Sequence, residues 1–391
     1  MALKLYLGGM PALFPRTCLY LAFVLFTLFA PAQTAAQELD EQDGFLVVRI
    51  NGSPVRLETF VAKMKNRGPA SQKLPIALIT HGKPPSNGRM GDMRARLYAM
   101  HARDFARRGY LAVVVMRRGF GRSDGPLPLP VSCGPKTFGD HFEATADDIE
   151  ATLVALAARE DADADRVVAI GASAGGAAVL TLAARNPRGL RGVISVSGGL
   201  RIEDCGKPEL LVEPLATSGA RAKVKTLWIY AENDRTFPPA IVDRMHEAWL
   251  SRGGDVRRVR VPAQGEDGHT MFNTLLGRRA WLAEADTFLR DIGLPTWSQT
   301  DVRAMAQKLG LPPAQAGVIE RYLFSPGEKA MARAPQSNRV FFQFGAPSMA
   351  EARQRALASC QNRPPKENCE IVAENNEYAT GDGERLLFGS R

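Results

Sequence analysis

Ser173 has the local surroundings of a catalytic nucleophile. It stands in the segment IGASAGG (170–176), after an apolar run (166–169) and before a helical stretch of small residues (177–185). In a G-x-S-x-G segment between a strand and a helix, the glycines let two backbones crowd at a sharp turn that lifts the serine hydroxyl above the sheet edge. The pattern predicts a nucleophilic serine; the alternative is a Gly/Ser-rich turn without chemistry.

A base and an orienting acid follow in the chain. A serine hydroxyl is a weak nucleophile, so it needs a histidine within reach and a carboxylate to orient that histidine. Asp234 follows the strand-like run 224–231, and His269 follows the next such run, 255–261. The order Ser, Asp, His is the one that accompanies this type of serine turn. Taken singly, Asp234 is also a candidate N-cap for a helix at Pro238, and His269 a candidate solvated loop residue.

The remaining histidines are poorer candidates for the base. Two of them fall in helical patterns and two precede the serine; the full set is His81, His101, His141, His246 and His269. Because each member of the Ser173, Asp234 and His269 set follows its own strand in the required order, we interpret the three as a catalytic triad.

Two upstream motifs, THG (80–82) and RRGFGRSDG (117–125), accompany the triad candidates. With them, residues 45–292 resemble an α/β-hydrolase domain of the dienelactone-hydrolase-like and prolyl-oligopeptidase-like branches. The resemblance implies that the backbone amides of Lys83 and Ala174 form the oxyanion hole. Dienelactone hydrolases use a cysteine nucleophile, so serine here favours general ester or peptide hydrolysis. Pro84 and Pro85 depart from a glycine-rich oxyanion loop.

The order of apolar and amphipathic segments predicts the same fold class. NGSP (51–54) joins two strand-like runs, 45–50 and 55–64, as a hairpin. Later strands are wholly apolar and alternate with helices, which predicts a mostly parallel sheet covered on both faces. The expected strands are 74–80, 110–116, 166–169, 192–197, 224–231 and 255–261, and the expected helices include 92–108, with Met93, Leu97, Met100 and Phe105 on one face, and 141–159. Only about 27 residues separate Ser197 from Val224, too few for a large helical lid.

The N-terminal segment predicts export. Lys4 and Arg16 precede an apolar run (18–30) that is short for a membrane span, and small residues then suit cleavage after Ala36. We therefore expect a signal peptide over 1–36, a bacterial periplasmic or secreted protein, and no stable membrane span after cleavage. The alternative is an uncleaved N-terminal anchor.

Cysteine usage agrees with an oxidising compartment. Removal of Cys18 with the signal leaves an even number of cysteines. Three pairings are possible. We favour Cys133 with Cys205, both in loops on the catalytic side, and Cys360 with Cys369, which are close in the chain. No cysteine or histidine spacing is typical of a zinc site.

Charge identifies no macromolecular partner. The net charge is +9, and +7 after loss of Lys4 and Arg16 with the signal, but arginines are scattered over helix faces and loops. We see no nucleic-acid motif, and neither a metal nor an organic cofactor is implied. Arg117 and Arg118 are expected to brace a loop, while Lys83 and Arg122 are candidates for contacting an anionic group. The sequence does not indicate an oligomeric state.

The C-terminal part predicts a separate small module. We expect the hydrolase domain over 37–294, a helical linker region over 295–338 with a Pro- and Gly-rich stretch at 326–338, and an α+β module over 339–391. In the module, 339–344 and 370–373 read as strands and 348–359 as a helix, with Ser348 and Glu351 as a capping box. Its role is either cell-envelope or substrate tethering, or packing against the hydrolase domain.

Together these features predict a serine hydrolase that cleaves a carboxylic ester through an acyl-enzyme. The expected partner is a small-molecule or peptide acyl substrate. One alternative is a serine peptidase of the prolyl-oligopeptidase style, since the same triad serves both reactions. A second is a non-catalytic envelope binding protein, against which the intact triad argues.

Overall fold

The computed structural model describes residues 39–65, 73–84, 89–127, 133–201, 205, 207–296, 300–312, 315–375 and 377–379. The predicted signal peptide (1–36) and Pro85 lie outside these ranges, so those expectations stay predictions. Within the ranges given, none of the helices has the length and apolar character that crossing a bilayer requires.

The hydrolase part is built on an eight-stranded sheet in the order β1-β2-β4-β3-β5-β6-β7-β8. From β4 onwards across the sheet all neighbours are parallel, whereas β2 runs antiparallel to both β1 and β4. This is the mixed sheet of the α/β-hydrolase fold, as predicted. The strands are β1 (Leu39–Ile50), β2 (Ser53–Met64), β3 (Leu74–Thr80), β4 (Leu111–Val115), β5 (Ala162–Ala172), β6 (Leu190–Val196), β7 (Lys225–Ala231) and β8 (Val256–Val261).

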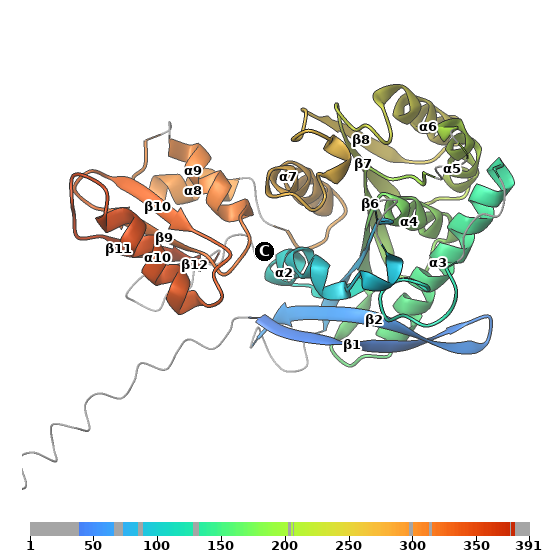
Figure 1. Cartoon of the computed structure of the whole chain (residues 1–391), viewed down its shortest axis with the longest axis horizontal. Coiled ribbons are helices and arrows are strands. Elements are labelled where there is room, and N and C mark those ends of the chain that lie inside the picture. The colour runs from blue at the N-terminus through green and yellow to red at the C-terminus, as the bar shows by residue number, and fades with distance from the viewer. Residues whose placement is uncertain are drawn as a thin grey trace, which may run out of the picture. The chain divides into compact units, whose positions relative to one another are not determined.

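Helices cover both faces of this sheet, because its central strands are apolar on both sides. Two separate apolar cores lie against the two faces, one lined by α2 and α7 and the other by α3, α4, α5 and α6. Figure 1 shows these two groups on opposite sides of the strands. The helices are α2 (Ala99–Arg107), α3 (Pro135–Ala157), α4 (Ala174–Arg185), α5 (Val212–Gly219), α6 (Pro239–Ser251) and α7 (Leu275–Asp291).

The predicted hairpin is confirmed, with a two-residue turn. Asn51 and Gly52 have φ values of 51° and 80°, as the hairpin turn that matches strand twist requires. This turn sets the register in which Ile50 pairs with Ser53 and Leu39 with Met64.

One predicted helix was wrong in detail. Instead of a continuous helix over 92–108, two 3-10 turns (Met90–Asp92 and Ala95–Tyr98) precede α2. Met93 and Arg94 between them are extended, so residues before and after this pair do not share one continuous helical periodicity. As a result Tyr98 faces the core, while Leu97, predicted to share one face with Met93 and Phe105, is 68% exposed.

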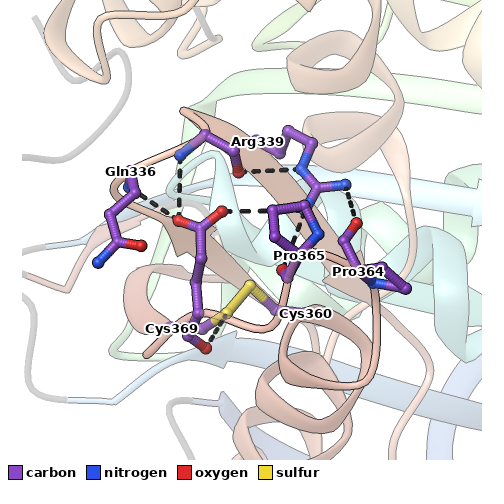
Figure 2. The surroundings of a disulfide bond; sticks show 8 residues. Gln336, Arg339, Cys360, Pro364, Pro365 and Cys369 are labelled. Atoms are coloured by element: carbon purple, nitrogen blue, oxygen red, sulfur yellow. Dashed lines mark hydrogen bonds and ion pairs between the residues drawn. A yellow bond between two sulfur atoms is a disulfide. The ribbon is translucent and has the colours of Figure 1, made fainter.

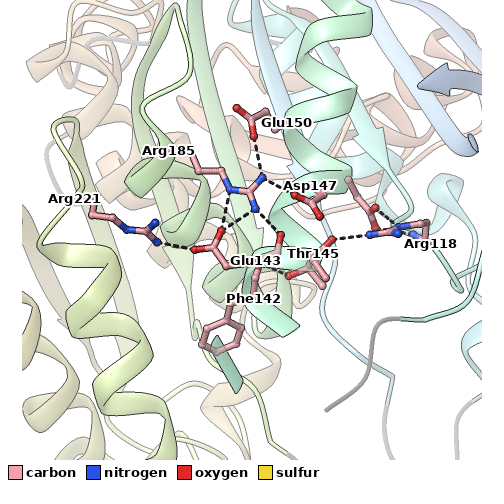
Figure 3. A network of polar contacts seen from close by, with 10 residues as sticks. Arg118, Phe142, Glu143, Thr145, Asp147, Glu150, Arg185 and Arg221 are labelled. Carbon is pink, nitrogen blue, oxygen red and sulfur yellow. Dashed lines mark hydrogen bonds and ion pairs between the residues drawn. The ribbon is translucent and has the colours of Figure 1, made fainter. Parts of the chain in front are cut away.

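A cluster of ion pairs joins α4 to α3. Arg185, in the last turn of α4, contacts three acidic side chains of α3, all at 2.8 Å: Glu143, Asp147 and Glu150. Arg221 adds a fourth contact, 2.6 Å from Glu143, as Figure 3 shows. Because α4 begins directly after Ser173, these contacts hold the helix that carries the serine turn against its neighbour.

Beyond α7 the chain forms a second, antiparallel sheet of four short strands in the order β10-β9-β11-β12. Its elements are α8 (Thr300–Lys308), α9 (Ala316–Phe324), β9 (Ala330–Ala334), β10 (Arg339–Gln343), α10 (Met349–Gln361), β11 (Glu370–Glu374) and β12 (Glu377–Tyr378). One apolar core packs α8 and α9 on one face of this sheet, and a second packs α10 on the other. Ser348 caps α10 by accepting a hydrogen bond from the Glu351 amide, as predicted.

The linker predicted at 326–338 was wrong, because the central strand β9 lies within it. Ala330, Ala332 and Ala334 of this strand share a core with the alanines of α10. Small side chains are needed there for close packing, and their low hydrophobic signal made the segment resemble a connection. The predicted region 295–338 therefore includes part of the module's sheet, and the boundary near 294 stays a prediction.

A disulfide closes the loop between α10 and β11. Cys360 is bonded to Cys369, and within the loop Glu367 accepts hydrogen bonds from the backbone amides of Gln336 and Ser337. Figure 2 shows this arrangement, with Arg339 donating to a backbone carbonyl of the same loop. The disulfide therefore closes the loop on itself, and the hydrogen bonds of Glu367 and Arg339 attach the loop to the turn between β9 and β10.

Candidate active site

The three triad candidates lie at the carboxyl edge of the large sheet. Ser173 directly follows β5, Asp234 follows β7, and His269 lies in a short 3-10 turn (Gly268–Thr270) after β8. Since β5, β6, β7 and β8 are consecutive parallel neighbours, the loops after them open at the same edge. The topology therefore brings together residues that are far apart in the sequence.

The backbone of Ser173 has the strained conformation of a nucleophile turn. Its φ and ψ are 50° and −120°, a region that side chains other than glycine rarely adopt. The Ser173 amide donates to the Val196 carbonyl at 3.0 Å, and its carbonyl accepts from the Gly199 amide at 3.0 Å. These bonds to the end of β6 and to the loop after it hold the turn in place.

Close backbone approach explains the glycines on either side. A Cβ added to Gly171 would lie 2.1 Å from the Gly175 carbonyl oxygen, and one added to Gly175 would lie 2.5 Å from the His81 carbonyl oxygen. Real Cβ atoms do not come so close to backbone atoms. Only glycine therefore fits at these positions without a shift of the turn.

A continuous hydrogen-bond chain links the three side chains. The Ser173 Oγ lies 3.1 Å from His269 Nε2, and His269 Nδ1 lies 3.1 Å from each carboxylate oxygen of Asp234. The Asp234 side chain is fully buried and that of His269 is 19% exposed. This geometry allows the imidazole to take a proton from the serine while the carboxylate fixes the opposite ring nitrogen.

The environment of Asp234 decides between the two interpretations of this residue. It does not cap α6, whose N-cap is Pro238. Its Oδ1 instead accepts from the backbone amides of Thr236 and Phe237 at 2.9 and 2.8 Å. These bonds fix the carboxylate so that it faces the His269 ring.

Two side chains that the sequence analysis missed join the acid loop to the histidine loop. The Asp267 Oδ1 accepts from the amides of Arg235 and His269 at 3.1 and 3.0 Å. Asn233 bonds in the other direction, accepting from the Gln264 amide at 2.8 Å and donating to the Gly265 carbonyl at 3.0 Å. A polar residue immediately before Asp234 and an acid two residues before His269 are the only sequence signals of this clamp.

The loop after β3 lies against the serine turn. A Cβ added to Gly82 would meet the Ser173 Cβ at 3.1 Å, so the peptide that follows Gly82 is adjacent to the nucleophile. Ala174 begins α4, where the first amides have no carbonyl partner within the helix. The loop that carries Lys83 and the first residue of α4, Ala174, therefore both lie next to Ser173, and their role as the oxyanion hole stays a prediction.

The other candidate residues have structural surroundings. Arg117 is buried and donates to the Thr80 hydroxyl and the His81 carbonyl, and Arg118 contacts Asp148 of α3 at 2.5 Å, in keeping with a bracing role. Arg122, considered for an anionic group, instead lies 3.3 Å from Glu58. In the part of the chain that the structure describes, no group of His, Cys, Asp and Glu side chains could hold a metal ion.

A second disulfide connects two loops of this edge. Cys133, before α3, is bonded to Cys205, which follows β6. The two disulfides are the pairings favoured in the sequence analysis. This one joins segments that follow β4 and β6, strands on either side of the central pair β3 and β5.

Part of the chain matches a known protein family. Residues 89–237 match the family described as "Serine aminopeptidase, S33". The matched span includes the serine turn and Asp234 and ends before His269. The match and the sheet order above agree on an α/β-hydrolase fold for the part of the chain that carries the serine turn.

Solved structures with a similar chain path include several hydrolases. A putative dienelactone hydrolase from Klebsiella pneumoniae is 19% identical, with a TM-score of 0.42, over 62% of this chain and 98% of its own. Acetyl xylan esterase 1 from Thermoanaerobacterium sp. is 17% identical, with a TM-score of 0.45, over 67% and 86%. Dipeptidyl peptidase 4 from Porphyromonas gingivalis is 17% identical, with a TM-score of 0.47, over 65% and 36%. A search of the curated proteins gave no match.

Proposed function

We propose that this protein is a serine hydrolase that cleaves a carboxylic ester through an acyl-enzyme. The observation that carries the proposal is the chain of contacts from Ser173 through His269 to the buried Asp234, each 3.1 Å long. Such a chain, at the end of a strained strand-to-helix turn, matches the roles of nucleophile, general base and orienting acid.

In the proposed acylation, His269 Nε2 takes the hydroxyl proton as Ser173 Oγ attacks the acyl carbonyl carbon. The carbonyl oxygen becomes an oxyanion, which accepts hydrogen bonds from the amides of Ala174 and Lys83. Loss of one such donor typically costs about 3–4 kcal/mol in the activation barrier. His269 then returns the proton to the departing alcohol oxygen, the ester bond breaks, and Asp234 stabilises the transient imidazolium.

In deacylation, water replaces the alcohol. His269 takes a proton from the water molecule, whose oxygen attacks the acyl carbon, and the proton passes to Ser173 Oγ as the acid leaves. The space for the acyl and alcohol groups is bordered by loops. The buried Phe237 ring meets that of His269 edge-on at 5.3 Å and so packs against the base.

A fluorophosphonate probe tests the activated serine directly, because it phosphonylates a serine, with loss of fluoride, only when a base has activated the hydroxyl. We expect labelling of the purified protein and its loss in Ser173→Ala, with unchanged melting temperature. Ser251→Ala, at an exposed serine at the end of α6, is the matched control and retains labelling. A folded wild-type protein that takes no label would contradict the proposal and favour the binding-protein alternative.

A peptidase is the second candidate, favoured by the description of the matched family. Matched p-nitrophenyl esters and p-nitroanilides of the same acyl groups separate the two. An ester hydrolase shows a preference for the ester beyond the difference in intrinsic reactivity, whereas a peptidase cleaves aminoacyl anilides with a comparable kcat/KM.

We also propose that the protein is exported. The apolar run at 18–30 and the two disulfides support this, because disulfides persist mainly in oxidising compartments. N-terminal sequencing of protein from a periplasmic or culture fraction is expected to begin at Gln37. A membrane fraction that retains the intact N-terminus would instead indicate an uncleaved anchor.

A further inference from the structure

The peptide unit between Gly82 and Lys83 is hydrogen-bonded through its carbonyl oxygen to the His81 ring. Its carbonyl oxygen, that of Gly82, lies 2.7 Å from Nδ1 of the fully buried His81 ring. Its N–H, that of Lys83, has no acceptor among the residues with described positions. In the proposed function this same N–H is an oxyanion donor, so the following inference rests on that proposal.

The hydrogen-bond pattern determines where the His81 ring carries its proton. The Arg117 backbone amide donates to His81 Nε2 at 3.2 Å, so Nε2 bears a lone pair. A neutral imidazole with a bare Nε2 is protonated on Nδ1. His81 Nδ1–H therefore donates to the Gly82 carbonyl oxygen.

Burial and the charge of Arg117 keep the ring in this neutral state. Both hold the pKa of His81 well below its ordinary value. The Arg117 guanidinium is itself buried, and one of its nitrogens lies 2.6 Å from the Thr80 hydroxyl and 2.7 Å from the His81 carbonyl oxygen. The side chain and the backbone of Arg117 thus fix both ends of His81.

Peptide geometry transmits this contact to the nucleophile. In a trans peptide the C=O and N–H point in opposite directions, so a carbonyl fixed towards His81 turns the Lys83 N–H away from it. A donor on the carbonyl oxygen also polarises the peptide and strengthens its N–H as a donor. The same loop lies against Ser173, as the 3.1 Å approach of a Gly82 Cβ demonstrates.

We propose that His81, locked by Arg117, is a positioning residue that aims and polarises the Lys83 amide for the oxyanion. It does not touch the substrate. Its effect is exerted through the Gly82–Lys83 peptide, and is therefore largest when negative charge develops on the acyl oxygen.

Two substitutions separate the two hydrogen bonds of His81. An asparagine amide occupies the position of Nδ1 and keeps a donor to Gly82, whereas a glutamine amide reaches the position of Nε2 and keeps only the contact with Arg117. We expect His81→Gln to lower kcat about tenfold to hundredfold with KM within about threefold, since loss of a whole donor costs about 10²–10³. His81→Asn is expected to recover most of that loss.

Affinity for a tetrahedral adduct is the readout that a merely structural role would not move. A boronic acid bonds to Ser173 Oγ and presents an oxygen to the oxyanion site, so its affinity should fall in His81→Gln by the same factor as kcat. His141→Gln, at a buried histidine of α3, is the control: it lowers the melting temperature without changing boronate affinity. Equal kcat and boronate affinity in wild type and His81→Gln would overturn the inference.

A measurement on the unchanged protein covers the case in which His81→Gln does not fold. Nitrogen-15 NMR of the His81 ring is expected to show a protonated Nδ1 and a bare Nε2, retained at pH 6.5, where an ordinary imidazole is half protonated. A bare Nδ1 would overturn the inference. Failure of the proposed function is distinguishable, because it would abolish fluorophosphonate labelling of the wild-type protein, whereas failure of this inference leaves that labelling intact.

Discussion

Ser173 and its two partners are held in place by different means. The serine depends on backbone: its φ of 50° is maintained by hydrogen bonds to the end of β6 and the loop after it, and by glycines at 171 and 175 that let main chains nearly touch. Asp234 and His269 depend on side chains, because Asn233 and Asp267 bond the two loops to each other.

The difference predicts different responses to mutation. Where two backbone segments are already in van der Waals contact, there is no room for an added atom. A substitution that adds a side chain there therefore disrupts the whole turn. A clamp of several hydrogen bonds loses its members one at a time, and each loss loosens the geometry by a limited amount. The four predictions below test this contrast.

The largest effect is expected from Asp234→Asn. An amide would offer an N–H to His269 Nδ1 and favour the wrong tautomer, so kcat/KM for the best ester should fall on the order of 10⁴. Asp243→Asn, at a partly exposed acid of α6 paired with Arg258, is the control and should stay within about twofold of wild type. A loss below tenfold in Asp234→Asn would argue against the acid role.

The next effect is on the serine side, from Gly171→Ala. The added methyl would meet the Gly175 carbonyl oxygen at 2.1 Å, so we expect a loss of about 3 kcal/mol in the free energy of unfolding, together with activity. Gly44→Ala in β1 meets nothing within 4 Å and should be neutral or slightly stabilising. Urea unfolding measures the stability of both variants. Equal stability would contradict the proposal that close backbone packing holds the serine turn.

On the other side, Asp267→Ala should act more gently. Loss of the bonds to the amides of Arg235 and His269 lets the histidine loop shift, and kcat should fall about tenfold to hundredfold at nearly constant KM. Asp267→Asn keeps an acceptor oxygen and should recover part of this loss. Glu266→Ala, one residue away and exposed, is the control, and equal losses in Asp267→Ala and Glu266→Ala would contradict the clamp.

The smallest effect is the dependence of stability on pH. His101 supports the histidine loop: its ring stacks on Phe272 at 4.0 Å and its Nε2 lies 3.1 Å from the Asn273 side chain. Burial lowers the pKa of His101 to about 4. Because the unfolded chain binds more protons between about pH 6.5 and 4, stability falls as the pH drops, by about 2 kcal/mol from pH 7 to 5.

His101→Gln should reduce that pH slope without removing it, since His81, whose pKa burial and Arg117 also lower, contributes in the same direction. Urea midpoints of wild type and His101→Gln at pH 7 and pH 5 provide the measurement. The same dependence of stability on pH in both proteins would mean that His101 does not contribute to it.

The contrast also explains how much of the site could be predicted. Crowded backbone requires glycine, and glycine at fixed spacing around Ser173 is visible in the sequence. A clamp such as that of Asn233 and Asp267 needs only an acceptor or amide somewhere in a loop, so its residue types are common and its partners lie about 30 residues apart in the sequence, a spacing with no pattern to detect.

The fold could be predicted to a similar extent. Strands buried on both faces, such as β3 and β4, have continuous apolar sequences that identify them. The alanine-rich β9 has no such apolar sequence, because packing against α10 requires small side chains. The buried face of α2 could not be predicted either, because the extended residues Met93 and Arg94 interrupt the helical pattern before it.

The order of β10, β9 and β11 has a consequence for synthesis of the chain. All eight strands of the large sheet have been made once Val261 is reached, but β9 stays open on one edge until Glu370–Glu374 has been added. A product that stops short of those residues would carry a finished hydrolase sheet beside a strand with free amides and carbonyls, the kind of edge that other chains can pair with. The last segment of the module thus separates a finished product from one prone to self-association.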